Sequence, residues 1–218
     1  HVLEIGPGLG VLTEEMLNRG CRVTAIEKDP VLAERLAASL GNPPNLTVIA
    51  DDALAWLARQ GAALSFDCMV SNLPYQAGTR ILLELVQKRA IPSLTVLVQT
   101  EVAERLAAPE GSKTRGLAGV WAQLDYDVRI VRKVSASCFW PRPEIGSSVV
   151  RLDRHDRNGG LSDEQRRVFY RLTKRAFEHR RKQLGSVFKN VIQSTNRAEE
   201  LSNADWVALA QTLSPADV

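Results

Sequence analysis

The side chains best suited to chemistry are Asn72 and Tyr75, in the segment Ser71-Asn72-Leu73-Pro74-Tyr75. Asn72 can accept a hydrogen bond through its side-chain carbonyl and donate through its amide. Tyr75 offers a flat ring on which another ring can stack. With the backbone fixed by Pro74, this turn could hold an exocyclic amine and present its nitrogen to an electrophile. The alternative is a strand-ending turn whose tyrosine packs in the core.

A buried strand must position this turn. The apolar run over residues 66–70 is typical of a strand in a parallel sheet. Pro74 cannot donate to a strand ladder, so we expect the strand to end before it. The turn then lies at the carboxyl edge of the sheet, where open α/β folds bind their ligands.

A glycine-rich turn, Gly6-Pro7-Gly8-Leu9-Gly10, follows an apolar strand over residues 2–5 and precedes a helix over 11–19. The glycines let backbone N–H groups approach a ligand at a helix N-terminus. Their spacing is G-x-G-x-G, not the dinucleotide G-x-G-x-x-G, and glycines also occur in such turns for packing reasons. The pattern therefore indicates a nucleotide site only together with other features.

Acidic residues follow the next two predicted strands, 22–26 and 46–50. Glu27 lies 19 positions after Gly8, close to the interval at which an acid binds ribose hydroxyls; otherwise it is a solvated strand-end acid. One of Asp51 and Asp52 caps a helix over 53–59, and the other could accept a hydrogen bond from an adenine amino group.

Five strand–helix units in series, which include a helix over 79–88 and a fifth strand over 94–98, predict a mainly parallel α/β sheet in three layers. Beyond this point we expect helices over 100–107 and 117–124, then two antiparallel strands over 127–134 and 147–152. The loop between those strands, residues 138–143, holds Phe139 and Trp140 beside prolines and an arginine. It suits base stacking and a buried plug at the sheet edge equally well.

The polar segment 153–160 predicts a domain boundary, with a first domain over 1–153 and a helical second domain over 154–218. Ser162 and Gln165 form a capping-box pattern at the start of its first helix. Residues 162–192 carry nine Lys and Arg against three Asp and Glu, although the whole chain has a net charge of only +3. Such density favours phosphate contact by Arg166, Arg167, Arg171, Lys174, Arg175, Arg180, Arg181 and Lys182.

Composition narrows the class of protein. The cysteines Cys21, Cys68 and Cys138 are odd in number and far apart, which argues against a disulfide framework or zinc site and fits a reducing compartment, the cytoplasm. No apolar run is long enough to span a bilayer. Because the chain opens in mid-pattern without Met, we expect it to be a piece of a longer protein.

Several segments together resemble the ribosomal RNA adenine N6-dimethyltransferases of the KsgA/RsmA family and their mitochondrial and erythromycin-resistance relatives. They are the glycine loop from Glu4 to Gly10, the Asn72-Leu73-Pro74-Tyr75 turn, and residues 101–106, 139–150 and 176–184. The resemblance implies a Rossmann-like class I methyltransferase sheet with one antiparallel strand and a small, basic, helical RNA-binding domain at the C-terminus. It implies S-adenosyl-L-methionine as cofactor, S-adenosyl-L-homocysteine as product, and no metal.

The resemblance also implies residue roles. Glu27 binds the ribose, Asp52 binds the adenine amine, and Gly6 and Gly8 approach the methionine part. The implied cofactor set is completed by Glu4, Lys28, Ala53 and Asn72. The implied catalytic residues are Asn72, Leu73, Pro74, Tyr75 and, stacking on the other face of the adenine, Phe139. The implied RNA contacts are Lys113, Arg115, Arg175, Arg180, Arg181 and Lys182.

The implied reaction is dimethylation of N6 on two adjacent adenosines near the 3′ end of small-subunit (16S-type) ribosomal RNA, during ribosome biogenesis. We expect small-subunit rRNA as the partner, no membrane, and a monomer. Three alternatives stay open: a large-subunit rRNA adenine dimethylase, a non-catalytic ribosome-assembly or RNA-binding factor, and a nicotinamide oxidoreductase. The missing third-glycine spacing and the Asn-Leu-Pro-Tyr turn count against the oxidoreductase.

Overall fold

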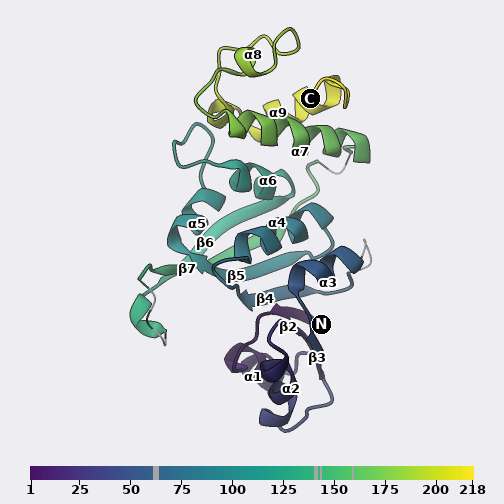
Figure 1. Ribbon diagram of the computed structural model, residues 1–218, viewed down its shortest axis with the longest axis vertical. Helices are drawn as coiled ribbons and strands as arrows, with labels where there is room; N and C mark the ends of the chain where they lie inside the picture. Colours follow the sequence, from purple (N-terminus) through teal and green to yellow (C-terminus); the bar gives the residue numbers. More distant parts are fainter. Residues whose placement is uncertain (61–63, 140–141, 143, 159) are drawn as a thin grey trace. The chain divides into compact units, whose positions relative to one another are not determined.

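The computed structural model describes the chain except for residues 61–63, 140–141, 143 and 159. A seven-stranded sheet with the order β3-β2-β1-β4-β5-β7-β6 dominates the described residues (Figure 1). Its strands are β1 (Val2–Ile5), β2 (Val23–Glu27), β3 (Leu46–Ala50), β4 (Cys68–Asn72), β5 (Ser93–Gln99), β6 (Tyr126–Val134) and β7 (Ser147–Arg154).

The sheet is mainly parallel. Strands β1 to β5 pair in parallel, whereas β7 runs antiparallel to β5, with Leu97 opposite Val149. Strand β6 is next to β7 at the edge. The predicted α/β fold with one reversed strand is confirmed. Because the strand order reverses between β1 and β4, the loops after these strands open a crevice at the carboxyl edge.

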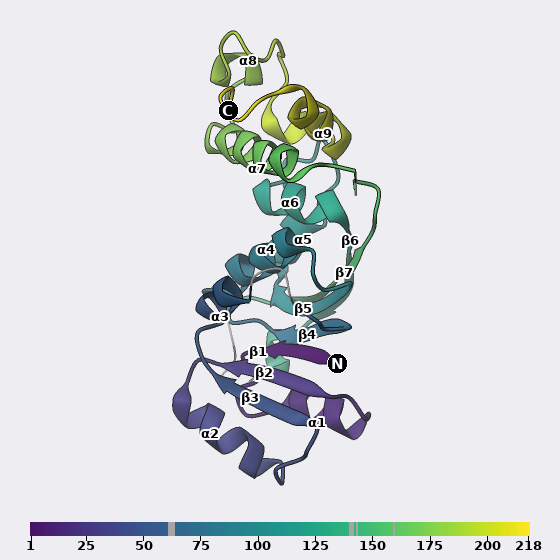
Figure 2. The same cartoon turned by 90° about the vertical axis from the view of Figure 1, so that its right-hand side faces the viewer.

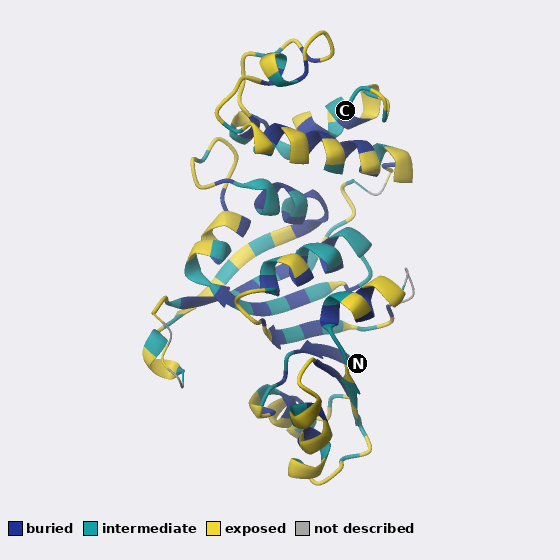
Figure 3. Cartoon of the chain, viewed as in Figure 1, coloured by how far each residue is buried: buried dark blue, intermediate teal, exposed yellow. Residues whose placement is uncertain are grey.

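Burial explains why these segments form strands. Every residue of β1 and β2 is buried, as is typical of central strands covered by helices on both faces (Figure 3). Strand β4 begins and ends two residues later than predicted, because Ser71 and Asn72 still pair with Val96 and Leu97 of β5. The ladder then ends before Pro74, as expected.

Helices α1 (Val11–Asn18) and α2 (Pro30–Ser39) lie near β2 and β3, and α3 (Ala53–Arg59) contacts α4 (Gly78–Lys88) (Figures 1 and 2). Right-handed crossovers place the two pairs on opposite faces, because the chain reverses direction across the sheet after β3. Asp29 caps α2 by accepting from the amides of Val31 and Leu32. Helix α5 (Thr100–Leu106) follows β5 directly.

Contacts divide the chain into two units, residues 1–103 with 127–154, and residues 104–126 with 155–218. We predicted residues 104–126 in the first domain, but they pack with the C-terminal helices. The helices of this second unit are α6 (Leu117–Asp125), α7 (Asp163–Glu178), α8 (Leu184–Val187) and α9 (Asn203–Thr212), with a 3₁₀ turn η2 (Ala198–Glu200).

Helix α7 organises the second unit. Its predicted capping box is confirmed, because the Gln165 amide donates to Ser162 Oγ and the Ser162 amide donates to Gln165 Oε1. Phe169 and Leu172 are fully buried, while the opposite side of the helix is exposed (Figure 3).

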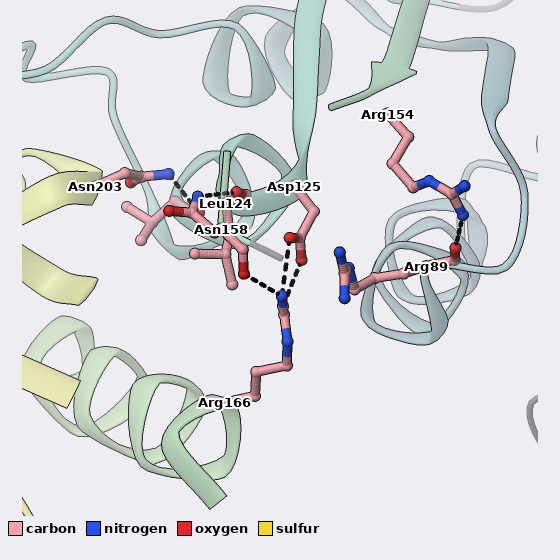
Figure 4. Close-up of polar contacts among 8 residues, drawn as sticks. Arg89, Leu124, Asp125, Arg154, Asn158, Arg166 and Asn203 are labelled. Atoms are coloured by element: carbon pink, nitrogen blue, oxygen red, sulfur yellow. Dashed lines mark hydrogen bonds and ion pairs between the residues drawn. The ribbon is translucent and has the colours of Figure 1, made fainter. Parts of the chain in front are cut away.

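An internal ion pair joins α7 to the end of α6 (Figure 4). Arg166 Nη1 donates to Asp125 Oδ2 at 2.7 Å, and Arg166 Nη2 donates to the Asn158 carbonyl at 2.7 Å. Asp125 is fully buried and Arg166 is 9% exposed. We counted Arg166 in the basic surface, and this was wrong: its charge is used inside the protein.

Candidate cofactor and adenine site

The glycine loop after β1 turns towards the Pro74 turn. Gly6 and Gly8 have φ values of +69° and +57°, in the left-handed region that favours glycine. A Cβ at Gly6 would lie 3.7 Å from Pro74 Cδ, and a Cβ at Gly8 would meet nothing within 4 Å. The loop therefore lies beside the Asn72–Tyr75 turn and leaves open space at Gly8.

Glu27, the last residue of β2, holds this loop. Its Oε2 accepts from the Gly8 amide at 3.1 Å, and its Oε1 accepts from the Asp29 amide at 2.9 Å. The residue is only 7% exposed. Each carboxylate oxygen keeps a second lone pair, so the side chain can still accept from a ligand hydroxyl.

Asp52 is the residue that caps α3. Its Oδ1 accepts from the amides of Leu54 and Ala55 at 3.0 and 3.1 Å, and its Oδ2 lies 3.1 Å from Lys28 Nζ. The hydrogen bond from Ala55, followed by that from Lys28, lowers the pKa of Asp52 below its usual value. Asp51 pairs instead with Arg59. Asp52 is thus an anchored carboxylate that remains ionised near neutral pH.

A cavity of about 220 Å³ lies at this edge of the sheet, and its lining includes Gly6, Glu27, Lys28, Asp51, Asp52, Ala53 and Pro74. Pockets that enclose a drug-sized ligand measure ~300–1,000 Å³, so this cavity suits part of a nucleoside cofactor. Gly8 and Asn72 are not among the described residues that line it.

Glu4, in β1 before the glycine loop, is 1% exposed. Its Oε2 accepts from Thr13 Oγ1 at 2.6 Å.

The Asn72 turn presents its polar groups at the surface. Asn72 is the exposed last residue of β4, while Leu73 is buried and donates its amide to the Leu97 carbonyl. The Pro74 carbonyl accepts from the amides of Ala77 and Gly78, which closes the turn into α4. Tyr75 is 40% exposed, so the alternative in which its ring packs in the core is wrong.

Phe139 follows the 3₁₀ helix η1 (Ala136–Cys138) and is half-buried. The segment carrying η1 projects away from the sheet between β6 and β7 (Figure 1). Among the residues that the structure describes, Phe139 makes no ring contact with Tyr75. Trp140, Pro141 and Pro143, part of the predicted aromatic loop, lie outside the described residues, and stacking on Phe139 stays a prediction.

The predicted RNA-binding residues of the second unit differ in exposure. Lys113, Arg175, Arg181 and Lys182 are exposed. Arg180 is half-buried and donates to the Lys113 carbonyl. Arg115 is fully buried and donates to Asn203 Oδ1 at 2.6 Å, so its prediction as an RNA contact was wrong.

One residue that sequence reasoning missed is Ser147, the first residue of β7. It is fully buried, and its Oγ lies 2.7 Å from the Tyr75 hydroxyl. Nothing in the sequence signals that a serine at the start of a strand will contact a tyrosine of the candidate site. Only the pairing of β7 with β5 brings it to the carboxyl edge.

Within the described residues, no group of three or more His, Cys, Asp or Glu could hold a metal ion. No helix in the same residues has the length and apolar character to cross a membrane.

The fold is that of a class I methyltransferase. It is defined by the strand order, the glycine loop after β1 and the acid that ends β2.

A family model described as "Ribosomal RNA adenine dimethylase" matches residues 1–217. A protein from Sphingopyxis alaskensis named ribosomal RNA small subunit methyltransferase A is 39% identical, over 97% of this chain and 83% of that protein. Its namesake from Mycobacterium tuberculosis is 41% identical, over 99% and 68%. The chain therefore belongs to the ribosomal RNA adenine dimethylase family, and it is a methyltransferase.

Two solved structures share the fold. A dimethyladenosine transferase from Plasmodium falciparum superposes with a TM-score of 0.77 and 23% identity, over 95% of this chain and 87% of that one. The 23S rRNA methyltransferase ErmE gives a TM-score of 0.68 and 22% identity, over 96% and 89%.

Proposed function

We propose that this protein transfers methyl groups from S-adenosylmethionine to N6 of two adjacent adenines near the 3′ end of small-subunit ribosomal RNA, during ribosome biogenesis. One observation carries the proposal: Pro74 of the Asn72–Tyr75 turn lines the same cavity as Gly6 and Glu27. An amine held by the turn is therefore next to a cofactor held by the loop. The names of the curated relatives favour the small subunit over the large one.

The residues in and beside the cavity fit S-adenosylmethionine. The open space over Gly8 admits a ligand close to the backbone, Glu27 can accept from ribose hydroxyls, and the ionised Asp52 can accept from the adenine amine. Lys28 pairs with the Asp52 carboxylate at 3.1 Å. When bound, the cofactor supplies an electrophilic methyl group on a sulfonium.

The protein's contribution to the reaction is orientation. The N6 lone pair of adenine is delocalised into the ring and is a poor nucleophile. Asn72 Oδ1 and a backbone carbonyl near Leu73 accept from the amino group, which turns the lone pair towards the methyl group. Tyr75 supports one face of the ring. Fixing such a geometry can supply much of a rate enhancement, and the methylated nitrogen then releases its proton to water.

The second unit supplies the RNA contacts. Lys113, Arg175, Arg181 and Lys182 are exposed cations that can contact phosphates of a folded RNA recognised by its shape. The target adenine must leave its stack to reach Asn72.

Free Cys21, Cys68 and Cys138 fit a reducing compartment such as the cytoplasm. We place the protein there as a monomer.

The test is methyl transfer from labelled S-adenosylmethionine to undermethylated small ribosomal subunits, with the RNA digested and analysed for N6,N6-dimethyladenosine. We expect Asn72→Ala to abolish transfer while cofactor affinity stays near that of the wild type, since Asn72 is assigned to the amine. Equal loss of binding and transfer would refute that role. Label in large-subunit RNA alone would indicate the other substrate, and cofactor binding without transfer would indicate an assembly factor.

A further inference from the structure

The side chain of Tyr75 is held by its hydroxyl group. The residue is 40% exposed, yet its hydroxyl lies 2.7 Å from Ser147 Oγ, and Ser147 is fully buried. The two residues are 72 positions apart in the sequence. An exposed tyrosine at a turn normally moves between rotamers, whereas this one has a hydrogen-bond partner built into the sheet.

The sheet fixes where that partner lies. Ser147 pairs with Gln99, the last residue of β5, because β7 runs antiparallel to β5. Asn72 pairs with Leu97 of the same strand. The first residue of β7 therefore lies at the edge where β4 and β5 end, and the Tyr75–Ser147 hydrogen bond crosses the end of β5.

We infer that Ser147 is a positioning residue for methyl transfer, which acts by holding the hydroxyl of Tyr75 so that the ring presents a fixed face to the target adenine. This inference rests on the proposed function, in which Tyr75 supports that adenine. The turn closed by the Pro74 carbonyl fixes the backbone end of the tyrosine, and Ser147 fixes the other end. Misplacing a reacting group by ~1 Å can cost ~100-fold in rate, so restraint at both ends matters.

The residue after Ser147 provides a matched control for the Ser147→Ala substitution. Ser148 is also fully buried in β7, and its Oγ lies 3.1 Å from Thr100 Oγ1, a hydroxyl pair that does not involve Tyr75. Ser148→Ala and Ser147→Ala each remove one buried hydroxyl from the same strand. If the hydroxyls of β7 served only to stabilise the strand, the two substitutions should lower the rate of methyl transfer equally.

The experiment compares kcat and KM for methylation of undermethylated small subunits among wild type, Ser147→Ala, Tyr75→Phe, the double variant and Ser148→Ala. We expect Ser147→Ala and Tyr75→Phe each to lower kcat about tenfold, which corresponds to about 1.4 kcal/mol, with cofactor affinity unchanged. The double variant should be no slower than either single variant, because both substitutions break the same bond. Ser148→Ala should match the wild type, and Ser147→Thr should restore much of the lost rate.

Multiplicative losses in the double variant, or equal loss in Ser148→Ala, would overturn the inference while leaving the proposed function intact. A double-mutant cycle on urea unfolding tests the bond without any activity, and absence of coupling between Ser147→Ala and Tyr75→Phe would also overturn it. Failure of the wild type to methylate any ribosomal RNA would remove the proposed function and this inference together.

Discussion

Glu4 should make the first unit less stable as pH rises towards neutrality. It is 1% exposed in β1, and burial is the main reason that its pKa is raised from 4.5 to about 7, with the charge of Glu27 adding to the shift and the Thr13 hydrogen bond opposing it. Between these two pKa values the folded protein binds a proton that the unfolded chain has released. Stability therefore falls as pH rises through this range.

The magnitude follows from the two pKa values. The two pKa values differ by about 2.5 pH units, and each unit corresponds to about 1.4 kcal/mol, so ionised Glu4 costs up to about 3.5 kcal/mol of stability above pH 7. Glu4→Gln keeps an oxygen that can accept from Thr13 Oγ1 and cannot ionise. The stability of Glu4→Gln relative to the wild type should rise by about that amount from about pH 4.5 to pH 8.

The assay is urea unfolding of both proteins across this pH range, with hydrogen exchange of the β1 amides reporting on the first unit alone. Effects common to both proteins cancel in the difference, and a constant cost of burying the Gln amide adds no dependence on pH. Thr13→Val provides a second arm: losing the donor to Glu4 should raise the pKa of Glu4 further, so that the loss of stability still begins near pH 4.5 but continues to higher pH. A stability difference that is flat with pH would refute the reasoning.

Three further predictions concern the cofactor, the RNA and the second unit. Glu27→Ala removes the acceptor for the Gly8 and Asp29 amides as well as the proposed ribose contact. Since bonds to charged groups contribute ~1.5–3 kcal/mol, the dissociation constant for S-adenosylmethionine should rise about tenfold or more by calorimetry, and an unchanged value would rule out the contact. Neutralising the exposed Arg181 and Lys182 with Gln should weaken RNA binding and reduce its salt slope by up to about 1.5; an unaltered slope would mean that they form only a solvated face. Arg166→Ala removes the ion pair with the fully buried Asp125, which should destabilise the second unit by ~3–5 kcal/mol in denaturant unfolding, and a loss below about 1 kcal/mol would contradict this.

Local signals account for most of the fold that could be predicted. The apolar runs of β1, β2 and β3 and the caps at Asp29 and Ser162 act within a few residues of where they occur, so the sequence displays them directly. The turn after β4 was also predictable, because proline cannot continue a ladder.

Long-range partners account for what could not be predicted. Arg115 and Arg166 look like surface cations in the sequence, but Asn203 and Asp125 hold them in the interior from 88 and 41 positions away. Residues 104–126 join the C-terminal helices for the same reason. The sequence shows which residues precede and follow a charged side chain, but it does not show the buried acceptor that the fold brings to that side chain.

The arrangement at the carboxyl edge explains how a site without a metal ligand set among its described residues can still favour one reaction geometry. Glu27 ties down the glycine loop, Ser71 Oγ donates to the Ile5 carbonyl and so links β4 to β1, and Ser147 holds the end of Tyr75. Each tie joins the ends of two different strands, and no tie depends on a ligand. The cost of ordering the loop and the turn is therefore met during folding, so in the proposed reaction binding energy can be used to orient the adenine amine.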